Sequence, residues 1–356
     1  MAKKTTSRAN FSDVGFIGVG LMGLPMAQNL LAKNPKMRLH VVNGHAEANL
    51  RKLTPASRVI RHDTPAKLAE HVSVCFTNLP VPDDVREVTL DGPDALIKGL
   101  RRGSIVIDCS TSSASLAQRI DKELQTIGCA GVDCPVSGAP VRAAAGTLSL
   151  MVGARPQVYR RIEPLLRCLG TPTHVGPPGA GQVTKSVNQI SIGLMIAGIS
   201  EGLLLARKAG LNLEKVLQAV GAGLGGSELM RIKGPNMIRN RFEPGFFMRY
   251  HLKDLNLTMD LARELGLTLP FTDMVRNLLG LGVEMGYGEK DHSAAMAVLE
   301  QIEKAQQEYE RKKAKGRGAK KAGRKKAGRT RSASTARKSA QGARKTGRRG
   351  RRVNIL

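Results

Sequence analysis

This sequence has very few aromatic residues, and it has no acidic residues at one end. It has no Trp, and only 3% of its 356 residues are aromatic. Residues 311–356 contain 20 Lys and Arg but no Asp or Glu, which leaves +7 of the formal net charge of +27 for residues 1–310. The basic character therefore belongs mainly to a tail, and the rest of the chain has room for about two domains of ordinary size.

The sequence also lacks the spacings that mark disulfide frameworks and metal sites. Its five Cys are odd in number, form no C-x-x-C pair and lie in or near apolar runs. We therefore expect buried free thiols in a reducing compartment. The seven His are scattered, without a pair of metal ligands on one helical face, and no metal is predicted.

The patterns of a signal peptide and of a membrane span are missing as well. The N-terminal MAKKTTSR is followed by Asp13 and a strand-like run rather than by the apolar segment of a signal peptide. The most apolar stretch, Ile190–Ala206, is interrupted by Glu201 and falls short of the ~20 residues that cross a bilayer. We expect a soluble, cytoplasmic protein without a membrane partner.

The most informative pattern is in residues 14–31, VGFIGVGLMGLPMAQNLL, which predict an apolar strand, a glycine-rich turn and the start of a helix. In this context G-x-G-x-x-G is typical of a dinucleotide site. Gly18 allows a sharp bend, Gly20 lets backbone N–H groups approach a pyrophosphate, and Gly23 lets the helix pack close to the strand. The helix N-terminus adds the positive end of its dipole. The predicted cofactor contacts of this turn are Gly18, Val19, Gly20, Leu21, Met22 and Gly23.

Short apolar runs alternate with amphipathic segments as far as about Val175, which predicts an α/β fold with a parallel, doubly wound sheet of the Rossmann type. After GPPGAG (176–181) helical periodicity replaces the strand pattern, and a helix at Gln182–Ala209 is long enough for the spine of a dimer interface. The predicted strands after the first lie at 38–43, 58–61, 72–77, 105–108, 130–136, 148–152 and 173–175. The predicted parts are a flexible N-terminus (1–11), a Rossmann domain that binds NAD(P) (12–177), an all-α substrate and dimerisation domain (178–309) and a disordered basic tail (310–356).

Eight short segments carry a more specific pattern. They are GFIGVGLMGLPMAQNL (15–30), NLP (78–80), IDCST (107–111), DCPVSGAP (133–140), AGTLSLMVG (145–153), GAGQVTKSVNQ (179–189), KDLNL (253–257) and GYGEKDHSA (286–294). Together, from about Val14 to Glu300, they resemble the β-hydroxyacid dehydrogenase family, which includes 3-hydroxyisobutyrate dehydrogenase and tartronate semialdehyde reductase. The resemblance implies an NAD(P)-dependent enzyme that transfers a hydride between nicotinamide and a small 3-hydroxy acid or its semialdehyde.

Lys185 is the predicted general acid and base, because hydride transfer at a carbinol carbon needs a group that takes or returns the hydroxyl proton. Partial burial near the positive end of a helix would lower its pKa, and the family pattern G-x-x-x-K-x-x-N implies the same role. Asn188 and Gln189, at i+3 and i+4, are predicted to face the same cleft, Gln189 as a catalytic amide and Asn188 as a substrate contact. Either amide could orient the lysine and bind the substrate, or one of them could bond to a neighbouring helix.

Ser137, Gly138 and Ala139 are the predicted substrate contacts. They follow a strand at its carboxyl end, where open α/β sheets bind ligands, and the resemblance implies that Ser137 and Gly138 hold the substrate carboxylate. The family's usual Ser-Gly-Gly is Ser-Gly-Ala-Pro here, and Pro140 has no N–H to donate, which leaves the identity of the substrate open. Asp291 matches a family position near the mouth of the site, and a helix N-cap is an equally good interpretation.

The end of the second predicted strand, Val42-Asn43-Gly44-His45, bears on the cofactor. It has neither an acidic residue for a ribose 2′-hydroxyl nor an Arg for a 2′-phosphate. Because Asn43 is a neutral donor and Arg51 and Lys52 follow on the next helix, we expect NADP, with NAD as the alternative. The resemblance implies further cofactor contacts at Leu79, Pro80, Thr111 and Lys253.

The tail from Arg311 is a low-complexity run of Lys, Arg, Ala, Gly, Ser and Thr that resembles the tails of histone H1-like bacterial proteins. It has almost nothing to bury, so we expect it to be disordered. Dense positive charge without aromatics suits binding of DNA or another polyanion through residues 311–352, which would associate the protein with the nucleoid. A purely solubilising tail is the alternative.

The main alternative function is that of a DNA-associated protein whose dehydrogenase-like core is a dimerisation scaffold, as in the nucleosome-associated glyoxylate reductase-like proteins of eukaryotes. Those scaffolds have lost the lysine found here at position 185, and imine reductases usually lack it. The decarboxylating 6-phosphogluconate enzymes share the lysine but continue with His-Asn-Gly-Ile-Glu, where this chain has VNQIS (187–191). The sequence favours an active enzyme that forms a homodimer or tetramer, and it does not name the hydroxy acid.

Overall fold

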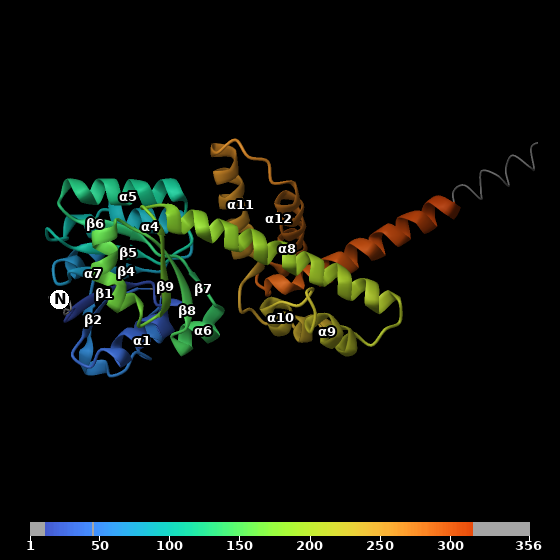
Figure 1. The fold of residues 1–356 in the computed structure, drawn as a ribbon, viewed down its shortest axis with the longest axis horizontal. Coiled ribbons are helices and arrows are strands. Elements are labelled where there is room, and N and C mark those ends of the chain that lie inside the picture. The colour runs from blue at the N-terminus through green and yellow to red at the C-terminus, as the bar shows by residue number, and fades with distance from the viewer. Residues whose placement is uncertain (1–10, 45, 316–356) are drawn as a thin grey trace, which may run out of the picture. The chain divides into compact units, whose positions relative to one another are not determined.

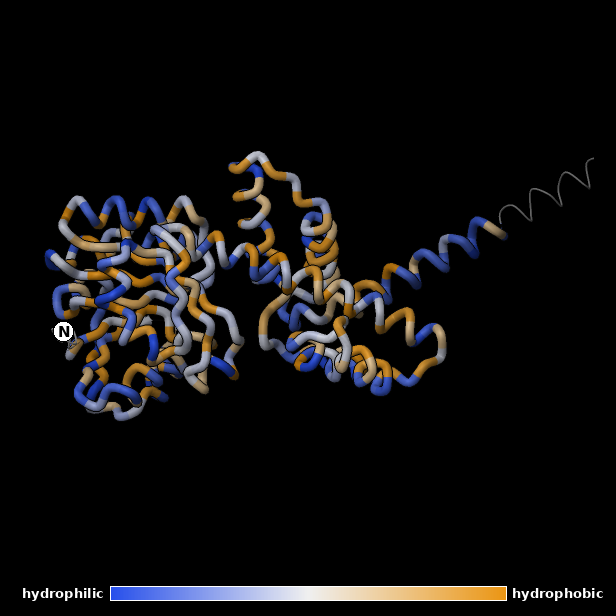
Figure 2. The backbone as a smooth tube through the Cα atoms, viewed as in Figure 1, coloured by the Kyte–Doolittle hydropathy of each residue, from blue (hydrophilic) through white to orange (hydrophobic). Residues whose placement is uncertain are grey.

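The computed structural model describes residues 11–44 and 46–315. The chain divides after Val298 into two compact units. Residues 299–315 of the second unit are helical, mostly exposed and largely hydrophilic in Figure 2. Nearly all of the predicted flexible N-terminus and most of the predicted disordered tail lie outside the described residues.

The first unit is built on one sheet with the strand order β3-β2-β1-β4-β5-β6-β8-β7, and β9 pairs with β8. Strands β1 to β6 pair in parallel, and Figure 1 shows α1 and α5 on opposite sides of the sheet. The strands are β1 (Asp13–Ile17), β2 (Arg38–Val42), β3 (Val59–His62), β4 (Val74–Thr77), β5 (Ile105–Asp108), β6 (Ala130–Asp133), β7 (Val136–Ser137), β8 (Leu148–Gly153) and β9 (Gly170–Gly176). The helices between them are α1 (Gly23–Lys33), α2 (Glu47–Leu50), α3 (Pro65–Ala69), α4 (Pro82–Arg86), α5 (Ala114–Thr126), α6 (Ala139–Ala145) and α7 (Pro156–Leu166), with short helical turns η1 (Ala56–Arg58), η2 (Glu87–Asp91) and η3 (Leu96–Lys98).

The sheet departs from a parallel arrangement at one edge. Residues 130–136, predicted as one strand, form β6 and β7 with Pro135 between them, because proline cannot donate a ladder hydrogen bond. Strand β8 then runs antiparallel to both. Residues 138–147 are too few for the crossover of about a dozen residues that a parallel pair needs, so α6 returns the chain directly.

Apolar side chains alternate between the two faces of the sheet. In β4, Val74 and Phe76 belong to one core cluster and Cys75 to the other. Helix α1 covers the first cluster with residues such as Leu30, and α5 covers the second with residues such as Ile120. All five Cys are buried and free, as predicted.

After β9 the described residues form helices. Helix α8 (Ala180–Lys208) agrees with the predicted long helix to within two residues at its start and one at its end. It is long and apolar enough to cross a membrane, unlike the shorter stretch counted from the sequence. It nevertheless packs against α10, α11 and α12 and buries Gln182, Lys185 and Gln189, so we interpret it as a core helix. The other elements are α9 (Leu213–Gly221), α10 (Glu228–Ile238), α11 (Met248–Glu264), α12 (Pro270–Gly282), η4 (Val283–Tyr287) and η5 (His292–Ala294).

The predicted division into two domains at residues 177–178 falls inside the first compact unit. The change from sheet to helices occurs there, between the end of β9 and the start of α8. The domain boundary itself stays a prediction.

Candidate active site

The glycine-rich turn between β1 and α1 has the shape that the sequence predicts. Gly18 has a φ of +96°, which L side chains rarely adopt, and a Cβ there would meet the carbonyl oxygen of Asn78. A Cβ at Gly23 would meet the carbonyl oxygen of Gly18, whereas the position beside Gly20 is open. Two of the glycines are therefore needed to form the turn, and the third leaves space beside the backbone for a ligand.

The start of α1 faces this space without a competing negative charge. No side chain caps the helix, and its first turn holds no acidic residue. Leu21 is exposed, while Val19 is buried and its carbonyl accepts a hydrogen bond from Asn49 Nδ2 at 3.0 Å. Met22 packs on the core cluster below. The N-terminal N–H groups and dipole of α1 therefore suit a pyrophosphate.

The other predicted cofactor contacts gather at the carboxyl ends of neighbouring strands. Leu79 follows β4, and its N–H donates to Ser110 Oγ, after β5, at 2.8 Å. The Thr111 carbonyl accepts from Lys253 Nζ of α11 at 2.7 Å. Pro80 is exposed. The strand order β1-β4-β5 places these residues along one edge of the sheet, where open α/β sheets bind ligands.

The end of β2 is more acidic than its own sequence indicates. Asn43 Nδ2 donates to Asp63 Oδ1, after β3, at 3.3 Å. Glu47 pairs with Arg61 at 2.8 Å and with Arg51 at 3.1 Å. Lys52 donates instead to Asn49 Oδ1 at 3.2 Å. Two arginines and one glutamate thus form a group with one excess positive charge, and the carboxylate of Asp63 lies 3.5 Å from Lys67 Nζ.

Helix α8 is fixed to the sheet at its first turn. Asp133, at the end of β6, accepts N–H bonds from Gly179 at 2.7 Å and from Gln182 at 2.9 Å. The Gln182 side chain in turn accepts from Ser112 N and donates to the Ser110 carbonyl. Burial raises the pKa of Asp133 to about 6. Sequence reasoning gave Asp133 and Gln182 no role, although both lie within the quoted family segments.

This anchoring places Lys185 beside β7. Its Nζ donates to the Val136 carbonyl at 2.9 Å, and the residue is 8% exposed. Burial lowers the pKa of Lys185, the carboxylate of Asp254 opposes this shift, and the cation of Lys253 adds to it. The structure thus supplies the buried lysine of lowered pKa that the sequence predicts.

Gln189 and Asn188 do not bond to the lysine. Gln189 Nε2 donates to Asp254 Oδ2 at 2.6 Å, and Asn188 Nδ2 donates to Gln189 Oε1 at 2.8 Å. Asp254 also lies 3.0 Å from Lys253 Nζ, although this contact leaves its Oδ1 without a well-directed hydrogen bond. Asp254 is therefore the centre of the polar cluster, and only its place in the segment KDLNL could have drawn attention to it.

The predicted substrate contacts join the end of β7 to the start of α6. Ser137 lies in β7 opposite Ser149, Gly138 has a φ of +145°, and Ala139 has a φ of +59°. Left-handed backbone at Ala139 costs about 1–2 kcal/mol, so the surrounding structure must hold it. The family usually has glycine, which adopts this conformation freely, where this chain has Ala139 at the start of α6.

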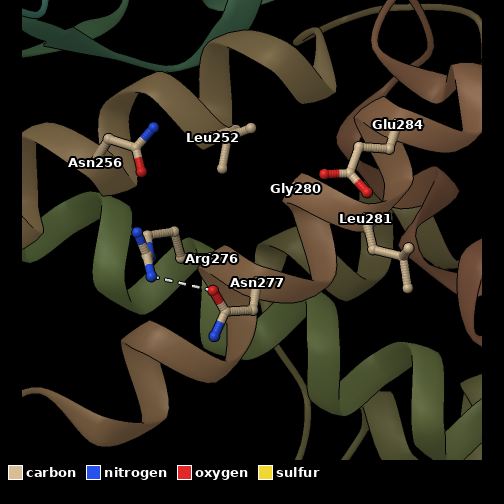
Figure 3. A pocket seen from close by; sticks show the side chains of 7 residues that line it. All are labelled: Leu252, Asn256, Arg276, Asn277, Gly280, Leu281 and Glu284. Atoms are coloured by element: carbon tan, nitrogen blue, oxygen red, sulfur yellow. Dashed lines mark hydrogen bonds between the residues drawn. The ribbon is translucent and has the colours of Figure 1, made fainter.

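Asp291 has the capping role that was one of its two interpretations. Its side chain accepts from Ser293 N at the start of η5, and it forms a buried ion pair with Lys233 at 2.6 Å. Among the described residues no group of three His, Cys, Asp or Glu is placed to hold a metal ion. A pocket of about 250 Å³ between α11 and α12 is lined by residues such as Asn256, Arg276 and Glu284 (Figure 3) and contains none of the predicted site residues.

Two family models of known proteins together match residues 13–299. The family model of the NAD binding domain of 6-phosphogluconate dehydrogenase matches residues 13–184. A second model, described as NAD-binding of NADP-dependent 3-hydroxyisobutyrate dehydrogenase, matches residues 179–299. The chain is 35% identical over 288 residues to 2-hydroxy-3-oxopropionate reductase of Escherichia coli (strain K12), which covers 81% of this chain and 97% of that protein.

Solved structures agree with these matches. A 3-hydroxyisobutyrate dehydrogenase from Salmonella typhimurium has a TM-score of 0.72 at 26% identity, over 80% of this chain and 99% of its own. The protein Psf3, solved in complex with NADP+ and 2-OPP, has the same TM-score, identity and coverage. The chain therefore belongs to the β-hydroxyacid dehydrogenase family of NAD(P)-dependent oxidoreductases, which includes 3-hydroxyisobutyrate dehydrogenase and tartronate semialdehyde reductase.

Proposed function

We propose that this protein transfers a hydride between the nicotinamide of NADP and a small 3-hydroxy acid or its semialdehyde, with Lys185 as general acid and base. The observation that carries the proposal is the buried Lys185, bonded to the Val136 carbonyl directly beside Ser137 and Gly138. Burial lowers the pKa of Lys185 and so favours a lysine that can both give and take a proton.

Different residues of the chain bind the cofactor and transfer the proton. The turn of residues 18–23 holds the pyrophosphate, and Leu79, Pro80 and Thr111 line the path toward the nicotinamide. When bound, the nicotinamide supplies or accepts the hydride at its C4. Lys185 donates a proton to the carbonyl oxygen of the semialdehyde during reduction and takes it back from the hydroxyl during oxidation.

The substrate is held by groups on both sides of the lysine. Ser137 Oγ and the Gly138 N–H bind the carboxylate. Asn188 contacts the reacting end of the substrate. Gln189, which Asp254 holds in one orientation, is the catalytic amide beside Lys185.

NADP is the proposed cofactor and NAD the alternative. The absence of an acidic side chain at the end of β2 and the excess positive charge of Arg51, Arg61 and Glu47 favour a 2′-phosphate. Asp63 beside Asn43 favours a free ribose hydroxyl instead. The ratio of kcat/KM for NADPH to kcat/KM for NADH decides between the two cofactors.

The test is a cofactor-consumption screen of the purified full-length protein over small semialdehydes and 3-hydroxy acids, with NADPH and NADH in parallel. We expect turnover of a semialdehyde with a higher kcat/KM for NADPH. Binding of the dinucleotide without turnover of any of these compounds would contradict the proposed reaction and favour the scaffold alternative. A higher kcat/KM for NADH would overturn the choice of NADP alone.

We also propose a homodimer or tetramer. Helix α9 buries none of its residues. Leu205 of α8 is 74% exposed, and Phe271 and Met274 of α12 are 70% and 69% exposed. Apolar side chains exposed to this extent suit an interface between copies. Light scattering during gel filtration should give at least twice the 38.2 kDa of one chain, and a monomer would contradict the proposal.

The basic tail supports a second, independent activity, the binding of a polyanion such as duplex DNA. Residues 311–356 carry 20 Lys and Arg without an acidic residue. The logarithm of the binding constant should fall linearly with the logarithm of salt concentration, by roughly 0.9 per phosphate contacted. A chain that ends at Glu310 should bind far more weakly and keep its catalysis. Equal binding by the full-length and shortened chains would contradict this proposal.

A further inference from the structure

Arg142 is a cation that neither the family resemblance nor the proposed reaction uses. It lies on α6, four residues beyond Gly138, and its side chain is 49% exposed. A Cβ at Gly138 would lie 2.7 Å from Arg142 Cβ and 2.9 Å from its Cδ, so the stem of the arginine packs over this glycine. The stem is therefore held against the loop that is expected to bind the substrate carboxylate.

Two cations thus flank the turn from Val136 to Gly138. The buried Lys185 bonds to the Val136 carbonyl, and the stem of the half-exposed Arg142 packs over Gly138. If the carboxylate of a substrate is bound at Ser137 and Gly138 and its hydroxyl at Lys185, we expect a further substituent to be the part that reaches Arg142. A methyl or hydrogen there would gain nothing from the guanidinium.

The nearest acidic partner of Arg142 is already engaged. Glu228 of α10 receives two hydrogen bonds of 2.7 Å from Arg231, one to each carboxylate oxygen. Arg142 Nη2 is 3.6 Å from Glu228 Oε1, which is longer than a hydrogen bond. These three side chains carry one excess positive charge, and the planar guanidinium of Arg142 is suited to a second carboxylate in a two-point contact.

We propose that Arg142 is a specificity-determining residue that binds the second carboxylate of a dicarboxylic hydroxy acid or semialdehyde. This inference rests on the proposed function, since it names the class of substrate for the same site. The first carboxylate is bound at Ser137 and Gly138, and the second, on the α-carbon substituent, is bound by Arg142 at the mouth of the site. Glu228 competes for the arginine and so sets the strength of this preference.

The test compares two substrates that share the reacting hydroxymethyl group, 3-hydroxy-2-methylpropanoate with one carboxylate and 2-(hydroxymethyl)butanedioate with two. Arg142→Ala should lower kcat/KM for the dicarboxylate about 10- to 100-fold, the range for losing a hydrogen bond to a charged group, and change the monocarboxylate value less than about threefold. Arg142→Lys should lower kcat/KM for the dicarboxylate by a smaller factor, because the charge is kept. Arg119→Ala, which removes an arginine 44% exposed on α5, is the matched control and should change neither value.

A second variant keeps the test independent of any damage to α6. Glu228→Gln removes the competing carboxylate and should raise the preference for the dicarboxylate. Equal losses for both substrates in Arg142→Ala, or no change of preference in either variant, would overturn the inference.

A binding measurement separates this inference from the proposed reaction. Butanedioate should bind to the protein with NADP+ more tightly than propanoate, and Arg142→Ala should abolish the difference. If neither hydroxy acid is turned over but this difference is present, the proposed function fails while the subsite stands. If turnover is present and the difference is absent, the subsite fails alone.

Discussion

The turn between β1 and α1 and the lysine site at the start of α8 are built from different components. The turn consists of backbone, in which Gly18 and Gly23 are required by shape and Gly20 leaves space beside it. The lysine site consists of buried side chains, with Lys185, Gln189 and Asp254 held by hydrogen bonds and by charge. Damage to the turn should therefore alter affinity and folding, whereas damage to the lysine site should alter proton transfer.

The largest effect should come from Lys185→Ala, which would make the sharpest separation between the two regions. Turnover should fall by roughly 10² to 10⁴, because a positioned general acid is lost, while the dissociation constant of the dinucleotide stays nearly unchanged. Steady-state kinetics and fluorescence titration of NADPH measure the two quantities. Lys122→Ala, at an exposed lysine of α5, is the control. Turnover near that of the unaltered protein would contradict the assignment.

Acid should destabilise the lysine region through His251, which lies beneath it. His251 is buried, and its Nε2 lies 3.4 Å from the Gln189 carbonyl. Burial lowers its pKa from 6.5 to about 4, and the groups whose charge acts on it include Asp254, Lys185 and Asp291. Below pH 6.5 the unfolded chain takes up the proton before the folded one does. The contribution of neutral His251 to the free energy of unfolding is therefore complete above pH 6.5. It is lost as pH falls toward 4, by up to ~3 kcal/mol.

Urea unfolding at pH 7 and at pH 5 measures this loss, and His251→Asn should reduce the dependence on pH. The sheet also holds a histidine of lowered pKa, His40, in contact with His62 and Asp13 at 2.8 and 2.9 Å. Fluorescence of probes placed separately near each group would assign the loss to one region. A difference in unfolding free energy between pH 7 and pH 5 that is as large in His251→Asn as in the unaltered protein would contradict the assignment to His251.

Two glycine substitutions should distinguish the glycine that the backbone conformation of the turn requires from the glycine that leaves space for a ligand. Gly18→Ala should lower the free energy of unfolding by about 1–3 kcal/mol, because a strained backbone position then carries a Cβ against Asn78. Gly20→Ala should leave the unfolding free energy of the protein without dinucleotide unchanged and weaken NADPH binding. Unchanged binding in Gly20→Ala would show that the open space beside Gly20 is not where the cofactor lies.

The smallest effect should come from Asp254→Asn, which tests whether charge or packing matters more at the lysine. The carboxylate of Asp254 raises the pKa of Lys185, so its loss should lower that pKa. The part of the pH profile in which oxidation accelerates with pH should then move to lower pH. Asp260→Asn, on the exposed side of α11, is the control. A fall in kcat at every pH without a shift of this part of the profile would indicate a packing role alone.

Much of the fold could be predicted because its signals are local. The strand at 105–108 has the bounds predicted for it, and α8 differs from its prediction by only one or two residues at each end. The split of residues 130–136 into β6 and β7 at Pro135 was not predicted, although proline is a local signal. The antiparallel direction of β8 depends instead on its pairing with both strands. Local periodicity fixes the type of an element, whereas strand direction depends on a partner that lies far along the chain.

The sequence by itself determined the turn and the position of Lys185 on its helix, since a glycine pattern and helical spacing depend on neighbouring residues. Tertiary structure decided what surrounds the lysine. Val136 and Asp254 come from segments 49 and 69 residues away in opposite directions, and Asp63, to which Asn43 donates, follows a different strand. Electrostatic and hydrogen-bond energies depend on distances between atoms, and only the folded chain sets those distances.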